Sequence, residues 1–114
     1  MVFNVAAHNR DDHAKNFAFL LDDQDGEWHL ASAYDLTCSP GPGGEHTTTI
    51  LGEGRDPGRD HCLRLAETFG IKPRESGPIL EQVNAAVDQW PDFADQARCS
   101  RKIMDTVAKG FLKL

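Results

Sequence analysis

Residues 11–36, DDHAKNFAFLLDDQDGEWHLASAYDL, decide how the first third of this chain folds. Two short apolar runs, 17–21 and 28–31, flank a polar stretch that contains the dipeptide Asp25-Gly26. Because Asp-Gly favours a tight turn between two strands, this pattern predicts a β-hairpin whose strands are those two runs.

The turn also predicts which residues lie near one another at the base of the hairpin. If Leu21 faces Trp28, then Asn16 lies opposite Ala33 in the antiparallel ladder. Ala33 is two residues from Asp35. The hairpin should therefore bring Asn16 and Asp35 together, even after a slip of one or two residues.

Asp11 and Asn16 stand five residues apart in the polar loop before the hairpin. This D-x-x-x-x-N spacing is that of a kinase catalytic loop, in which the carboxylate takes a proton and the amide oxygen holds Mg²⁺. Asp35 is the candidate for the second carboxylate that such a metal site needs. The spacing selects Asp11 as the base, whereas Asp12 should be an exposed loop residue or a cap. The alternative is an Asx-turn that only satisfies loop backbone groups.

The rest of the chain is expected to be mainly helical. Residues 1–8 have the apolar spacing of a helix that starts abruptly. Residues 60–114 should form a helical bundle, with helices at 61–69 and 77–90, a short segment at 92–97 and a last helix after Ser100. The expected fold class is mainly α with a small β-hairpin region.

Several local features refine this expectation. Gly70 is placed to end one helix, and Ser76 to cap the next, with Pro78 tolerated in its first turn. Residues 39–44, SPGPGG, should form a flexible loop, and 47–50 one more short strand. The last helix should direct an apolar stripe inward: Ile103, Met104, Val107, Phe111 and Leu112.

Composition limits the classes of function. The 114 residues suffice for one small domain, and 18 acidic against 12 basic side chains give a net charge of −6, which argues against direct nucleic-acid contact. Cys38, Cys62 and Cys99 form no C-x-x-C pair, so a zinc ribbon is excluded and buried free thiols in a reducing compartment are expected. With no signal peptide and no long apolar run, we expect a cytoplasmic protein without membrane contact.

Other metal sites and hydrolase sites find no support in the sequence. A calcium loop ending at Asp25-Gly26 would begin at Leu21 and would need Glu at Ser32, so it fails at both ends. None of the five histidines has H-x-x-x-H or H-E-x-x-H spacing, which argues against metal storage or sensing. No serine stands in a recognisable hydrolase arrangement.

Three blocks of sequence, in this order and separation, resemble a known family: DDHAKNF at 11–17, GEW-L at 26–30 and AYDL at 33–36. Together, residues 3–36 are similar to the C-terminal domain of the HipA family, which are serine/threonine kinases of bacterial toxin–antitoxin systems with a kinase-like bilobal fold. LAETFGI and AAVDQWPDFA, later in the chain, are similar to the helical region of that domain with less specificity.

The resemblance implies roles for individual residues. Asp11 corresponds to the catalytic aspartate, Asn16 to the metal-binding asparagine, and Asp35 to the aspartate at the place of D-F-G, here without its phenylalanine. His13 and Lys15, in the same block, are candidates for nucleotide contact, although Lys15 also fits a solvated loop lysine. The implied cofactors are Mg²⁺ and ATP.

The resemblance also implies what surrounds this chain in a whole protein. Residues 1–114 would be a kinase C-lobe without the N-lobe that carries the nucleotide lysine, so the chain alone should be inactive or barely active. The full protein would phosphorylate a translation component such as an aminoacyl-tRNA synthetase, contribute to bacterial persistence, and be restrained by a HipB-like DNA-binding antitoxin. The alternative is a non-catalytic helical remnant that serves as a protein-interaction or regulatory module.

Overall fold

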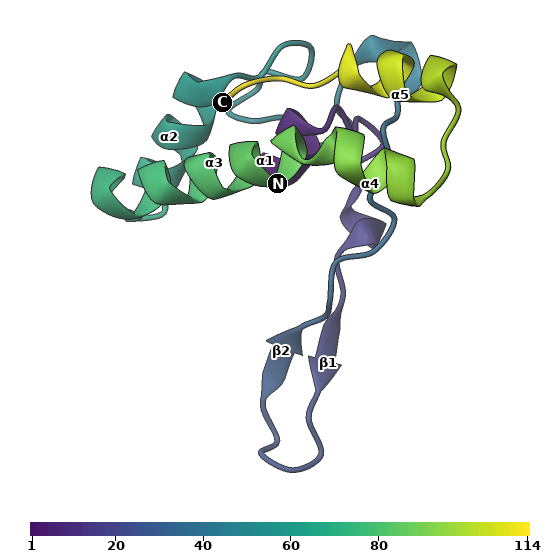
Figure 1. Ribbon diagram of the computed structural model, residues 1–114. Helices are drawn as coiled ribbons and strands as arrows, with labels where there is room; N and C mark the ends of the chain where they lie inside the picture. Colours follow the sequence, from purple (N-terminus) through teal and green to yellow (C-terminus); the bar gives the residue numbers. More distant parts are fainter.

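The computed structural model describes residues 1–114 as a mainly helical body from which one β-hairpin projects (Figure 1). The hairpin strands are β1 (Phe19–Leu21) and β2 (Trp28–Leu30), paired antiparallel. The helices are α1 (Val2–Ala6), α2 (Arg59–Thr68), α3 (Pro73–Asp88), α4 (Trp90–Gln96) and α5 (Arg101–Ala108), with short 3₁₀ turns at Ala14–Asn16 and Pro42–Gly44. None of these helices has the length and apolar character that would let it cross a membrane.

The hairpin has the predicted register. Leu21 faces Trp28 and Phe19 faces Leu30, and the ladder continues towards the body because the Ala31 N–H donates to the Ala18 carbonyl at 2.8 Å. At the tip, Gly26 has φ +73°, which a glycine adopts at little cost. The strands are shorter than predicted, since they span 19–21 and 28–30 rather than 17–21 and 28–31.

The hairpin carries its apolar side chains in the open. None of the residues in β1 and β2 is buried, and Trp28 keeps 67% of its surface exposed. The large apolar residues of this arm and its base that remain exposed are Phe17, Phe19, Leu20, Leu21, Trp28, Leu30, Tyr34 and Leu36. A two-stranded sheet gains little stability alone, so the arm depends on its attachment to the body.

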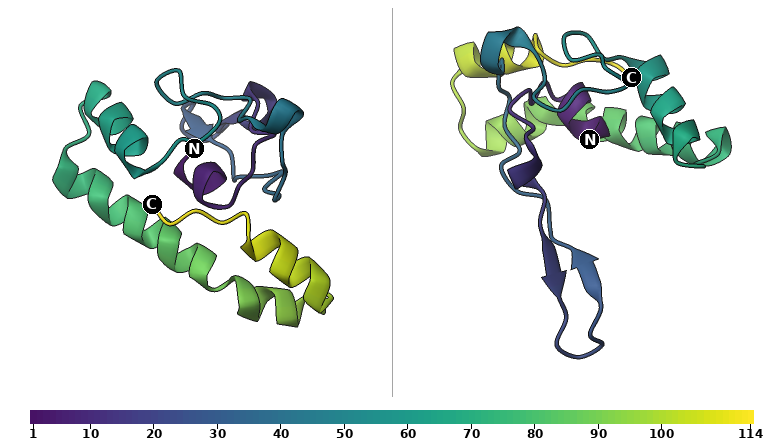
Figure 2. Two further views of the ribbon diagram at one scale, coloured as in Figure 1. Left: turned by 90° about the horizontal axis from the view of Figure 1, so that it is seen from above. Right: turned by 180° about the vertical axis from the view of Figure 1, so that it is seen from behind.

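Helix α3 is the central helix of the helical body. Helices α1 and α2 pack against it, α4 continues beyond it, and α5 folds back onto α4 (Figure 2). The core is small, and its buried members are Val5, Ala6, Ile50, Cys62, Leu80 and Leu114. The Asn84 side chain fixes the last residue to α3, because it donates to the Leu114 carbonyl and accepts the Leu114 N–H at 3.0 Å.

Two predicted elements differ in the structure. Helix α3 begins at Pro73 rather than after Ser76, because Pro73 occupies the first turn, where its missing N–H costs nothing. Pro78 therefore lies inside the helix, and Ser76 is a buried residue rather than a cap. The predicted strand at 47–50 is wrong, because these residues form loop contacts and only Ile50 pairs, in an isolated bridge with Glu53.

The C-terminal helix is partly as predicted. Ser100 caps α5, since its hydroxyl accepts the Ile103 N–H at 3.4 Å. However, no residue of α5 is buried, and Ile103 is more than half exposed, so the predicted inward stripe is only half-covered. In this region Trp90 forms an edge-to-face pair with Phe111, with ring centroids 6.0 Å apart, and its Nε1 donates to the Met104 carbonyl at 3.1 Å.

The three cysteines differ in exposure. Cys62 is buried in the core as expected, whereas Cys38 is exposed in the loop after the hairpin and Cys99 is half-buried. Burial raises the pKa of the Cys62 thiol. The expectation of buried thiols therefore holds for Cys62 and is wrong for Cys38.

Candidate functional site

The loop that precedes the hairpin is held to the body by Asn9. Its side chain is buried, with 1% exposed, and donates both to the Asn4 Oδ1 of α1 at 3.3 Å and to the Asp35 carbonyl at 3.2 Å. Asn9 also pairs with Ser39 in an isolated parallel bridge. One amide thereby fixes α1, the loop and the backbone of Asp35 relative to one another.

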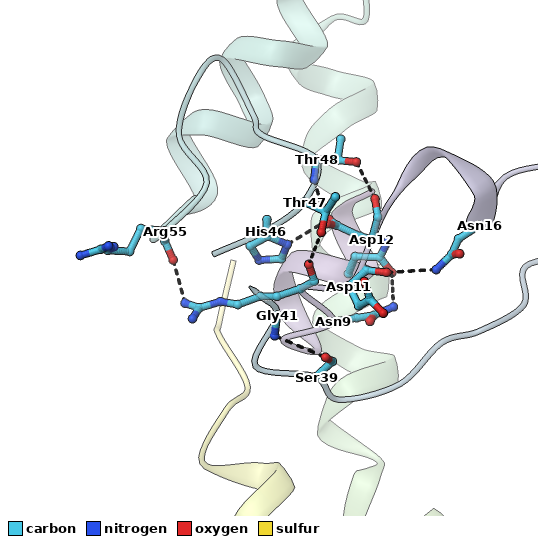
Figure 3. A network of polar contacts seen from close by, with 12 residues as sticks. Asn9, Asp11, Asp12, Asn16, Ser39, Gly41, His46, Thr47, Thr48 and Arg55 are labelled. Atoms are coloured by element: carbon cyan, nitrogen blue, oxygen red, sulfur yellow. Dashed lines mark hydrogen bonds and ion pairs between the residues drawn. The ribbon is translucent and has the colours of Figure 1, made fainter. Parts of the chain in front are cut away.

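Asn16 joins the segments that carry the three predicted site residues. Its Nδ2 donates to the Asp11 carbonyl at 3.1 Å (Figure 3) and to Asp35 Oδ2 at 3.3 Å. The contact between Asn16 and Asp35 confirms the neighbourhood that the hairpin register predicted. Asn16 Oδ1 and Asp35 Oδ1 make no hydrogen bond within the protein, and the Asp11 and Asp35 side chains are exposed.

Asp35 adopts a left-handed backbone conformation with φ +55°. This conformation costs a non-glycine residue on the order of 1 kcal/mol and persists only where neighbours impose it. Here the Asn9 side chain holds the Asp35 carbonyl, and the Asp35 carboxylate meets Asn16. The strain therefore coincides with a residue that the sequence singled out.

Asp12 is not the exposed residue that the sequence predicted. It is buried, with 3% exposed, and its Oδ2 lies 2.9 Å from His46 Nδ1 while its Oδ1 accepts the Thr48 N–H at 3.0 Å (Figure 3). The Thr48 hydroxyl donates to the Asp12 carbonyl. Both carboxylate oxygens are satisfied, which is the condition for burying such a group. Asp11 is then the free carboxylate of the adjacent pair.

Arg10 ties the same loop to the glycine-rich segment. Its Nη1 donates to the Gly44 carbonyl at 2.6 Å and its Nη2 to the Arg55 carbonyl at 2.7 Å. The chain passes so close at Gly41 that a Cβ there would lie 2.3 Å from the Glu45 carbonyl oxygen. The SPGPGG segment is thus packed against the candidate catalytic loop, although its composition predicted flexibility.

The two weaker candidates contribute less to the site. Lys15 is exposed, and its carbonyl accepts the Tyr34 hydroxyl. His13 is half-buried, with an Nδ1 that is enclosed and has no hydrogen-bond partner. Neither side chain bonds to Asp11, Asn16 or Asp35, so their role in nucleotide contact remains a prediction.

A cavity of about 240 Å³ opens beside Asn16 at the base of the hairpin. Most of its lining is apolar, with contributions from Phe3 of α1, Leu30 of β2 and Leu36. The cavity joins the polar group at Asn16 to an apolar surface, which is the common composition of a small-molecule site.

A second acidic group lies at the hairpin tip, where Asp22, Asp25 and His29 have ligand atoms within 4.8 Å of one another. All three are exposed, and the two carboxylates already accept N–H groups of the turn, from Gln24 and Glu27. This matches a solvated turn, as the failed calcium pattern indicated.

Sequence reasoning missed the residues that position the site, namely Asn9, Arg10, His46 and Thr48. His46 pairs with Asp12 across 34 residues, and no spacing rule reports such a contact. The only local signal was that His46 stands two residues after the glycine-rich segment ends at Gly44.

Comparison with known proteins gives one match. The family model described as HipA-like C-terminal domain matches residues 1–90. No curated protein and no solved structure matches the chain.

Proposed function

Since this chain belongs to the HipA-like C-terminal domain family, we propose that it is the kinase-like C-terminal lobe of a protein serine/threonine kinase. The observation that carries the proposal is the position of Asn16, whose amide contacts both the Asp11 backbone and the Asp35 carboxylate. The contacts of Asn16 thus bring together Asp11, from the loop before the hairpin, and Asp35, from the segment that follows β2.

Asp11 is the proposed general base. Its carboxylate is exposed, whereas both oxygens of the neighbouring Asp12 carboxylate already contact His46 and Thr48. A base must reach the substrate, so exposure favours Asp11. It would take the proton that a serine or threonine hydroxyl loses as the hydroxyl oxygen bonds to the γ-phosphorus of ATP, while the bond from that phosphorus to the bridging oxygen breaks and ADP leaves.

Asn16 and Asp35 are the proposed metal ligands. Each has one oxygen free of protein contacts, because Asn16 Nδ2 and Asp35 Oδ2 are the atoms that meet. One carboxylate and one amide oxygen suit Mg²⁺, which completes its shell with phosphate and water oxygens. When bound there, Mg²⁺ neutralises charge on the β- and γ-phosphates.

The cavity beside Asn16 supports a place for the nucleotide, since its apolar lining suits a flat base and Asn16, one of the two proposed metal ligands, lines it. The 114 residues contain no glycine-rich phosphate loop that follows a strand. We therefore expect weak ATP affinity and little or no phosphoryl transfer by this chain alone.

Metal-dependent nucleotide binding tests this proposal. We expect Mg²⁺-ATP to bind the wild-type chain in calorimetric titration, and Asp35→Ala to weaken that binding at least about tenfold, because it removes a charged ligand. Asp23→Ala is the matched control, since Asp23 is an exposed hairpin carboxylate without a hydrogen bond to its side chain. Equal affinities of wild type and Asp35→Ala would refute the metal site.

A second candidate function is an interaction or regulatory module without transfer chemistry. The exposed apolar hairpin favours it, because large apolar patches commonly mark contact surfaces. This candidate predicts no nucleotide affinity that depends on Asp35. For the whole protein, a protein substrate and a HipB-like antitoxin in a toxin–antitoxin system remain the proposed partners.

A further inference from the structure

Asp35 is held at two separate points, and only one of them involves a proposed metal ligand. Its Oδ2 accepts from Asn16 Nδ2 at 3.3 Å, whereas its backbone carbonyl accepts from Asn9 Nδ2 at 3.2 Å. Asn9 stands two residues before the proposed base, Asp11, in the same loop. Asn9 therefore contacts Asp35 through an atom that a bound metal ion would not use.

Asn9 is itself fixed to the helical body. Its N–H donates to the Asn4 carbonyl at 2.8 Å, and its Nδ2 donates to Asn4 Oδ1 at 3.3 Å. The flanking backbone is tied to Ser39, because the Ser39 N–H donates to the His8 carbonyl at 3.0 Å and the Arg10 N–H donates to the Ser39 carbonyl at 3.2 Å. Asn9 is thus anchored through its side chain and through the backbone on both sides of it.

The residue type at position 9 suits these contacts. The two acceptors are Asn4 Oδ1 and the Asp35 carbonyl, and one side-chain amide carries two N–H donors on a single nitrogen. An ionised aspartate would offer only acceptors, and a serine only one donor. Asparagine is therefore the shortest side chain that can donate to both groups at once.

Two energetically unfavourable features meet at the hydrogen bond between Asn9 and Asp35. Asp35 has φ +55°, and Asn9 Oδ1 is buried without a hydrogen-bond partner. Left-handed backbone at a non-glycine residue persists only where neighbours impose it, and such strain clusters at functional sites. A buried polar atom without a partner likewise calls for an explanation. Their coincidence favours a role of Asn9 in the site over one in stability alone.

The backbone conformation of Asp35 determines where its carboxylate lies. A change from φ +55° to the ordinary extended conformation would turn the Cα–Cβ bond relative to the flanking chain. The carboxylate would then move away from Asn16, which it now meets at 3.3 Å. The same rotation would displace the Asp35 carbonyl, which is the group that Asn9 holds.

We propose that Asn9 is a positioning residue for the proposed Mg²⁺ site. By holding the Asp35 carbonyl, it keeps Asp35 in the left-handed conformation and its carboxylate beside Asn16. This role rests on the proposed function, in which Asp35 and Asn16 hold Mg²⁺. Without the hydrogen bond, metal binding would have to order Asp35, and this cost lowers the affinity.

The conformation of Asp35 can be tested without any metal. At φ near +55° the N–H and Hα protons of a residue lie close together, so NMR should show a strong intraresidue nuclear Overhauser effect for Asp35. We expect that effect in the wild-type chain and a weaker one in Asn9→Ala. Asn4→Ala is the matched control, because it removes the other side-chain acceptor of Asn9 and leaves the Asp35 contact in place.

A milder variant covers the case in which Asn9→Ala does not fold. Asn9→Ser keeps a polar group at the buried position but shortens the side chain, so it should also weaken the Asp35 effect. The proposal is overturned if the folded Asn9 variants give the same Asp35 effect as Asn4→Ala.

Titration with Mn²⁺ alone tests the consequence for the site, because Mn²⁺ prefers the same oxygen ligands as Mg²⁺ and broadens the resonances of nearby protons. We expect the Asn16 side-chain amide of the wild-type chain to broaden, and Asn9→Ala to need about 3- to 10-fold more Mn²⁺ than Asn4→Ala for the same broadening. No broadening in the wild type would refute the metal site, and the role of Asn9 with it. Broadening that is equal in Asn9→Ala and Asn4→Ala would refute the role of Asn9 alone.

Discussion

The loop at 8–16 and the hairpin at 17–31 adjoin in sequence but are stabilised in opposite ways. The loop buries polar groups that are held by hydrogen bonds, as the Asn9 Nδ2 and both oxygens of the Asp12 carboxylate illustrate, although Asn9 Oδ1 and His13 Nδ1 have no partner. The hairpin leaves apolar groups in the open, with every residue of β1 and β2 exposed. The geometry of the candidate site therefore depends on buried hydrogen bonds rather than on apolar packing, and mutations in the two regions should have very different costs.

The largest expected effect separates the two adjacent aspartates. Asp12→Ala leaves His46 buried without its carboxylate, which should lower the free energy of unfolding by about 3–5 kcal/mol. Asp11→Ala, at an exposed position, should change it by no more than about 0.5 kcal/mol. Urea denaturation of both variants measures the difference. Equal losses in the free energy of unfolding would contradict the interpretation that buried hydrogen bonds hold this loop.

A somewhat smaller effect should appear in the glycine-rich segment. Gly41→Ala places a Cβ 2.3 Å from the Glu45 carbonyl oxygen, which should cost about 2–4 kcal/mol through steric clash and strain. Gly43→Ala has the same φ of +69° but open space around the new Cβ, so about 1 kcal/mol is expected. Thermal melts of the two variants isolate the contact from the backbone conformation.

The pH dependence of stability should also differ between the regions. Because the folded state lowers the pKa of His8, the unfolded chain binds that proton first as pH falls below about 6.5. The His8 contribution is thus present above pH 6.5 and lost below it, and His8→Gln should flatten the curve. His29→Gln, at the exposed hairpin, is the control. If His8→Gln instead lost more stability than the wild type as the pH falls, the predicted sign of the effect would be wrong.

The smallest effect on stability is expected in the hairpin. Replacing Leu20 and Trp28 by threonine removes two exposed apolar side chains, so the free energy of unfolding should change by no more than about 0.5 kcal/mol. Binding of a hydrophobic dye should nevertheless fall, because the patch itself is reduced. A large loss of stability would show that the arm packs onto the body.

The hairpin and its register were predictable because the determinants are local. Asp25-Gly26 fixes the turn, and pairing then carries Asn16 to Asp35 without further information. The family resemblance likewise rests on contiguous blocks. Asp12 shows the limit, because its partner His46 lies 34 residues away and only the packed chain brings them together. An aspartate beside another aspartate gives no sign of which one is buried.

The helices show a similar division. Ser100 caps α5 as predicted, since capping is decided within one turn. The start of α3 was misplaced because Pro73 and Ser76 are both good first-turn signals, and the buried position of Ser76 decides between them. The apolar stripe of α5 stays half exposed because little of the chain packs over it, and the sequence of the helix alone does not show this.

The composition of the projecting arm determines how proteases should attack this molecule. Residues 16–54 contain no lysine or arginine, so trypsin has no cleavage site between Lys15 and Arg55. The same stretch displays exposed Phe19, Trp28 and Tyr34, which are substrates for chymotrypsin. Thin, weakly packed segments open most readily to proteolysis. Chymotrypsin should therefore nick the arm first, whereas trypsin should release a fragment in which the hairpin, Asn16 and Asp35 remain on one peptide.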